Sequence, residues 1–118
     1  MSDLQKLDQE LNQMLLSGKT MEAFEKYYAE DVVMQENSEP PRIGKAVNRK
    51  FEQEFFATVE TVHGMQLLSS GAGTEKAYSE WELDITFKNG SRAKMSQIAV
   101  RQWKHGKVAH ERFYYSRG

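Results

Sequence analysis

The second half of the chain alternates apolar and polar side chains over long stretches that are separated by glycine turns. In "AYSEWELDITF", residues 77–87, three carboxylates (Glu80, Glu82 and Asp84) fall on one side and an apolar stripe falls on the other. A period of two is that of a β-strand, because successive side chains point to opposite faces of a sheet. The turn sequences "GAGT", "NG" and "KHG" connect such stretches as hairpins do. The predicted strands cover about 59–69, 77–87, 92–103 and 107–116.

The first half of the chain has mainly helical spacing. Apolar residues recur every three to four positions over about 3–17, and a second helix is expected to start with Thr20 as its cap. A short strand at 31–36 and the proline-containing loop "NSEPPRIG" follow. A third helix is predicted over about 45–57, with the apolar residues Val47, Phe51 and Phe55 one turn apart.

Helices followed by long strands with tight turns indicate one α+β domain over residues 1–118, with three N-terminal helices packed on a strongly curved antiparallel sheet. Long strands twist and coil. A coiled sheet with helices across its concave side forms a cone, and a cone has an open end. The sequence therefore predicts a pocket between helices and sheet.

Composition excludes several kinds of function. The net charge of −1 does not indicate a basic surface of the kind that binds nucleic acid or an anionic membrane. The absence of cysteine excludes thiolate nucleophiles and thiolate metal sites. No histidines have the spacing of a metal site, so we expect neither a metal nor another cofactor. The first residues, "MSDLQKLDQEL", do not resemble an export signal, and the expected location is the cytoplasm.

The order of these segments resembles a known family. "YYAEDVVMQEN", a proline loop, a glycine and a helix, then a meander ending "GKVAHERFYYS", is similar to the NTF2-like superfamily, in its SnoaL-like branch of polyketide cyclase and steroid isomerase relatives. The resemblance covers essentially the whole chain. It implies a cone-shaped barrel, a pocket between helices and sheet, and commonly a homodimer through the outer sheet face. We expect this pocket to take a small apolar molecule that bears a hydroxyl or carbonyl group.

The resemblance also implies positions for a site. Glu36, just before the proline loop, matches the general base of steroid isomerases, and Glu80 and Glu111 are placed on the concave side as further catalytic candidates. The implied ligand-binding residues are Tyr28, Met34, Glu82, Met95, Gln97, Phe113 and Tyr115.

The residues themselves leave alternatives open. The carboxylates at 80, 82 and 84 can equally form a solvated sheet face. Glu80 or Glu111 can form a structural ion pair with Arg101 or Arg112 instead of acting on a ligand. Leu11 stands where steroid isomerases carry an oxyanion-donating tyrosine, which favours binding over catalysis, whereas the carboxylates favour acid–base chemistry. An acid–base enzyme, a non-catalytic binding protein and a dimeric interaction module therefore all remain.

Overall fold

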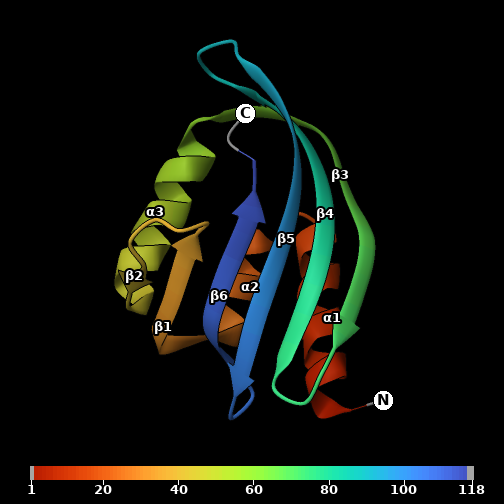
Figure 1. Ribbon diagram of the computed structural model, residues 1–118. Helices are drawn as coiled ribbons and strands as arrows, with labels where there is room; N and C mark the ends of the chain where they lie inside the picture. The colour runs from red at the N-terminus through yellow and green to blue at the C-terminus, as the bar shows by residue number, and fades with distance from the viewer. Residues whose placement is uncertain (1, 117–118) are drawn as a thin grey trace.

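The computed structural model describes residues 2–116, which form one layer of helices against one face of a curved sheet (Figure 1). The strands are hydrogen-bonded in the order β2-β1-β6-β5-β4-β3. The elements are α1 (Asp3–Leu16), α2 (Thr20–Tyr27), β1 (Tyr28–Glu36), β2 (Arg42–Ile43), α3 (Lys45–Ala57), β3 (Val59–Ala72), β4 (Lys76–Phe87), β5 (Arg92–Lys104) and β6 (Lys107–Tyr115).

The sheet confirms the predicted meander and corrects two features of the predicted barrel. Strands β3 to β6 pair antiparallel in succession, but β1 lies parallel to β6, and β2 and β3 remain as separate edges of an open sheet. The third helix lies after β1 and β2 and before the four long strands, which is the order of the predicted segments. Side-chain alternation marks a strand without stating its neighbours or its direction, so the pattern could not predict the parallel pairing or the open edges.

The two N-terminal helices form the apolar core together with β1, β5 and β6. Ser2 and Gln5 form a reciprocal capping box at the start of α1, which fixes where that helix begins. The second helix starts at Thr20 as predicted, but Lys19 occupies the cap position and no side chain caps it. Within residues 2–116, no helix is long and apolar enough to cross a membrane.

Helix α3 has the predicted bounds, but the stripe of Val47 and Phe51 is not its buried side. Val47 is 54% exposed and Phe51 is 37% exposed, whereas Asn48 is fully buried. The Asn48 amide donates to the carbonyl oxygens of Gly44 (2.8 Å) and Arg42 (3.0 Å), which anchors the helix to the preceding loop. Phe51 instead stacks beneath the Arg42 guanidinium, 3.6 Å from the ring centroid. Hydrogen bonding of a buried amide, not an apolar stripe, therefore sets the rotation of α3.

Strand β4 turns its apolar stripe toward the helices. Trp81 and Ile85 are each 4% exposed and lie on the concave face. Glu80, Glu82 and Asp84 alternate with them and therefore lie on the outer face, which corrects the inward placement of Glu80 and Glu82. The helices supply the apolar cover that the stripe needs, so the carboxylates remain on the side that water can reach.

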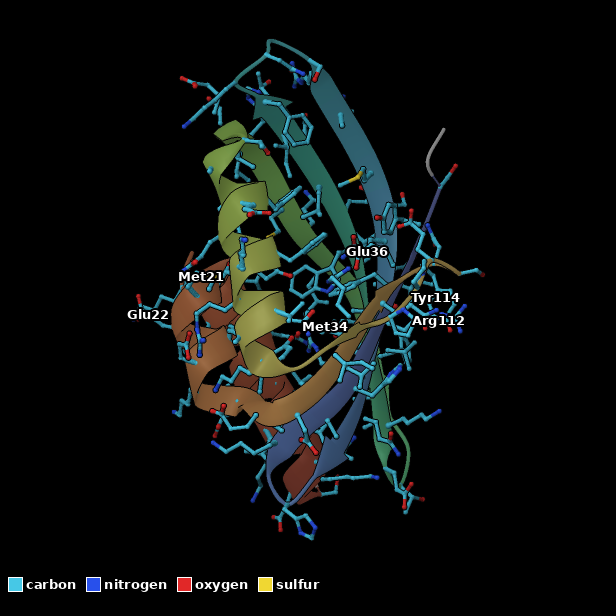
Figure 2. The ribbon with its side chains drawn as sticks, turned by 90° about the vertical axis from the view of Figure 1, so that its left-hand side faces the viewer. Met21, Glu22, Met34, Glu36, Arg112 and Tyr114 are labelled. Atoms are coloured by element: carbon cyan, nitrogen blue, oxygen red, sulfur yellow. The ribbon has the colours of Figure 1, made fainter. Side chains whose placement is uncertain are left out.

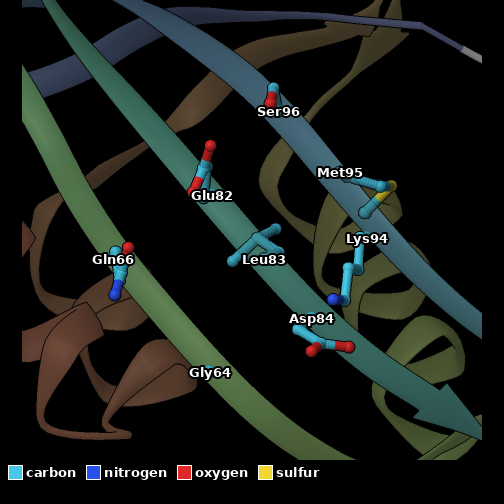
Figure 3. A pocket seen from close by; sticks show the side chains of 8 residues that line it. All are labelled: Gly64, Gln66, Glu82, Leu83, Asp84, Lys94, Met95 and Ser96. Carbon is cyan, nitrogen blue, oxygen red and sulfur yellow. The ribbon is translucent and has the colours of Figure 1, made fainter.

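The outer-face carboxylates have local partners of their own. Glu80 accepts a hydrogen bond from Ser69 (2.8 Å), and Asp84 forms a two-pronged pair with Arg92 (2.8 and 2.9 Å). Figure 3 shows Glu82 and Asp84 on this outer face, with the helices behind the sheet. The solvated-face interpretation of this stripe is therefore the correct one.

Candidate functional site

A cavity of about 180 Å³ lies between the helices and the concave face of the sheet. Its walls come from all three helices and from β1, β3, β4, β5 and β6, and most of the lining is apolar. This volume is below that of pockets for drug-sized molecules, so the cavity suits a small ligand. Its aromatic lining residues are Phe24, Tyr28, Phe55, Phe56, Trp81 and Phe113.

A buried ion pair forms one wall of the cavity. Arg101 on β5 and Glu111 on β6 are directly opposite in register, and their side chains meet at 2.6 Å with 2% and 1% exposure. The Tyr28 hydroxyl donates to the other Glu111 oxygen at 2.5 Å. Burial, together with the nearby Glu111 charge, raises the pKa of Tyr28 well above its ordinary value, so this hydroxyl keeps its proton.

The network extends from this pair to helix α1. The Arg101 Nη1 atom donates to Asp8 at 3.1 Å and to Asn12 at 2.8 Å. Asp8 also accepts from the Trp103 indole at 3.0 Å, and Asn12 donates to Ser79 Oγ at 2.9 Å. Five elements of the fold are thereby joined through charged and polar side chains that are all buried.

Glu52 on α3 is the one carboxyl of the lining that has no such partner. Within residues 2–116 it makes no hydrogen bond or ion pair, although it is only partly exposed. Burial, reinforced by the charges of Glu111 and Glu36, raises the pKa of Glu52 to about 7, against a weaker opposing effect of Arg42. At neutral pH this carboxyl therefore exchanges readily between its protonated and ionised forms.

Gln97 on β5 is a second polar group that the protein leaves available. Its side chain lines the cavity next to the Trp81 position across the β4–β5 pair. Over the part of the chain that the structure describes, it forms no side-chain hydrogen bond. A primary amide both donates and accepts, so Gln97 can bind a hydroxyl, carbonyl or amino group of a ligand.

The structure brings together part of the predicted site. Five of the predicted residues line the cavity, and the Glu111–Arg101 pair confirms the structural interpretation that the sequence left open. These five residues are Tyr28, Met34, Gln97, Glu111 and Phe113.

Glu36 shares the concave face with Met34, and Figure 2 shows both on the side of α3, whereas Arg112 and Tyr114 lie on the outer side. The Glu36 carboxylate is ion-paired with Arg42 at 2.7 Å, so it is held at the margin of the cavity and not presented to its interior.

The remaining predicted residues lie elsewhere. Glu80 and Glu82 are on the outer face, as described above, and neither Met95 nor Tyr115 is part of the described cavity lining. Met95 instead lines a hollow on the outer face, described below, and Tyr115 is held through its backbone amide, which donates to Asn37 at 2.9 Å. Alternation identifies the face of a strand, but not which residues of that face line a cavity.

Sequence reasoning missed Glu52. Its spacing contains the signal, because Glu52 lies four residues after the buried Asn48 and three before Phe55, and therefore on the same side of α3. The apolar residues Val47 and Phe51, on which the prediction of this helix rests, lie on a different and more exposed side of α3.

A second hollow, of about 320 Å³, lies on the outer face over β3, β4 and β5 (Figure 3). Gln66, Glu82, Asp84 and Lys94 make it polar, and Asp84 is already paired with Arg92. It is a shallow surface without a buried unpartnered group. No set of three or more histidine or acidic side chains among the described residues is placed to hold a metal ion.

Comparisons with known proteins agree with this architecture. A family model described as a SnoaL-like domain matches residues 3–115. The chain belongs to the SnoaL-like domain family. The predicted resemblance to the SnoaL-like branch of the NTF2-like superfamily is thereby confirmed. A search of curated proteins finds no match.

Solved structures of SnoaL-like proteins have the same fold. A candidate SnoaL-like polyketide cyclase from Mesorhizobium loti is 28% identical with a TM-score of 0.87, and the match covers 98% of this chain and 100% of that one. A candidate SnoaL-like polyketide cyclase from Jannaschia sp. CCS1 (9% identity, TM-score 0.84) and a candidate isomerase from Bacillus subtilis (16%, 0.81) match over 98% of this chain and 90% of theirs. At these lower identities the likeness is one of fold.

We expect Arg101→Met to lower the free energy of unfolding by about 3–5 kcal/mol, because it leaves Glu111 and Asp8 as buried carboxyls without their cation. Urea denaturation followed by circular dichroism measures this change. The matched control is Arg92→Met, which removes an exposed ion pair with Asp84 and should change stability little. Equal effects of the two variants would contradict the role assigned to the buried network.

The raised pKa of Glu52 predicts a pH-dependent stability. The folded protein binds this proton more tightly than the unfolded chain, so ionisation of Glu52 lowers stability as pH rises from about 4.5 to 7, by roughly 3 kcal/mol at most. Glu52→Gln should therefore match the unsubstituted protein near pH 4.5 and exceed it in unfolding free energy at pH 8. Glu54→Gln, on the exposed side of the same helix, is the control and should show no such pH-dependent gain.

Proposed function

We propose that this SnoaL-like protein binds a small, largely apolar molecule in the cavity, and that Glu52 exchanges a proton with it without the help of a cofactor. The observation that carries the proposal is an unpaired, partly buried carboxyl in a mostly apolar cavity, with a pKa of about 7. A general acid or base works best when its pKa is near the working pH. Gln97 is the group that would orient a hydroxyl or carbonyl of the ligand.

The proposal changes the roles that the resemblance implied. Glu111 is committed to Arg101 and Tyr28, so it positions the cavity wall and is not the proton-transfer group. Glu36 acts on Glu52 through its charge. Binding without chemistry remains the alternative, and it requires the same cavity with Glu52 and Gln97 as polar anchors.

Binding can be tested by closing the cavity. Val62 lines it, yet is 53% exposed, so Val62→Trp should obstruct the cavity with little loss of stability. Val47→Trp is the matched control, because Val47 is 54% exposed on α3 and lies outside the lining.

In a thermal-shift screen of small lipophilic compounds, we expect hits for the unsubstituted protein and the Val47→Trp control, and a loss of the shift in Val62→Trp. Hits that survive in Val62→Trp would place the ligand elsewhere. No hits in any variant would count against the proposed binding function.

We further propose that two copies associate through the outer face of the sheet. This face exposes Tyr78 (42%), Ile98 (40%) and Tyr114 (43%), and Ile98 and Tyr114 are register neighbours on β5 and β6. Neighbouring exposed apolar side chains favour an interface. Sedimentation velocity at micromolar concentration should give a dimer that Ile98→Lys dissociates and Val47→Lys does not. A monomer before substitution would refute this proposal.

A further inference from the structure

Of the charged side chains that line the cavity, Arg101 and Glu111 have partners among the described residues and Glu52 does not. Arg101 is the one cation of the described lining, and Glu111 and Asp8 both contact it. Its Nε and Nη1 atoms already donate to groups of the protein. An anionic ligand would therefore meet a cation whose charge is already matched by two carboxyls. Glu52, in contrast, has no partner within the described residues.

Aromatic rings lie beside this free carboxyl. Phe55 and Phe56 follow Glu52 by three and four residues on α3, so all three project toward the same region of the helix surface. Both rings line the cavity, with their centroids 5.7 Å apart, and Trp81 lines it from β4. Ring faces attract cations, most strongly where water is excluded. The cavity thus combines an unpaired acceptor with surfaces that favour positive charge.

We propose that the ligand of this cavity carries a protonated amine, which pairs with the Glu52 carboxylate while the apolar body of the ligand packs against the aromatic lining. This inference rests on the proposed binding function and names the chemical class of the ligand. It also fits the surrounding charges: Glu111 on β6 and Glu36 on β1 face Glu52, and the two nearby cations are already paired, Arg101 with Glu111 and Arg42 with Glu36. A bound ammonium offsets the repulsion that otherwise disfavours ionised Glu52, and it holds this carboxyl in the form that a general base requires.

Isothermal titration calorimetry with benzylamine and benzyl alcohol tests the inference, because the two probes have nearly the same shape and differ in charge. At pH 7.5 we expect benzylamine to bind at least about tenfold more tightly than benzyl alcohol. Glu52→Gln should abolish this preference, and Glu54→Gln should retain it.

Linkage gives a second readout. Below pH 7, benzylamine must displace the proton of Glu52, so its dissociation constant should rise as pH falls, and proton release should be measurable in buffers of different ionisation enthalpy. Benzyl alcohol should release no proton, and in Glu52→Gln the release should disappear.

Equal affinity for the two probes, or tighter binding of benzoate than of benzylamine, would overturn the amine assignment while leaving ligand binding in the cavity intact. Retention of the amine preference in Glu52→Gln would overturn it as well. If no probe binds at any pH, the amine assignment fails together with the proposed binding function, and the Val62→Trp experiment shows independently whether other ligands use the cavity.

Discussion

The ion pair between Arg101 and Glu111 is the constraint on which the rest of this structure depends. Both side chains are almost fully buried, and a buried charge is tolerated only when its partners are in place. Those partners come from distant parts of the chain: Asp8 and Asn12 from α1, and Tyr28 from β1. The network therefore requires one register between β5 and β6 and one position of α1 over the sheet. These requirements determine which part of the concave face is covered by the core and which part borders the cavity.

The polar groups of the buried network bond mainly to one another, and this determines which groups the cavity offers to a ligand. The strongest donors near the cavity, the Arg101 guanidinium and the Tyr28 hydroxyl, are directed at Glu111. What remains for a ligand is an apolar surface with Glu52 and Gln97 exposed on it. Helix α3 supplies Glu52, and the buried amide of Asn48 one turn earlier sets the rotation of that helix. A structural hydrogen-bonding residue thus determines which carboxyl the cavity presents.

Much of the fold could be predicted from local pattern, and much of the site could not. Glycine at position 90, in the left-handed region with φ of 92°, ends the hairpin that "NG" indicates, and the bounds of α3 follow from its flanking sequence. Which face of the sheet the helices cover depends on tertiary packing and not on the local sequence pattern. In β4 the stripe of Trp81 and Ile85 could face helices or a second subunit, and alternation is the same in both cases. Gln97 and Glu111, which the family resemblance implied, do line the cavity. The resemblance could not identify Glu52, because the surroundings that shift the pKa of a carboxyl are provided only by the assembled fold.

The distribution of donors and acceptors also bears on the chemistry that the cavity can support. Reactions that develop negative charge on a bound molecule need donors directed at it. Here Tyr28 and Arg101 are already engaged with carboxyls, and the Gln97 amide is a donor without a side-chain partner among the described residues. Positive charge is better accommodated, by Glu52 and by the aromatic rings. An oxyanion-forming reaction of the steroid isomerase type would therefore have weak electrostatic support in this cavity. Recognition of a cation, or proton removal by an ionised Glu52, uses the groups that the fold leaves free.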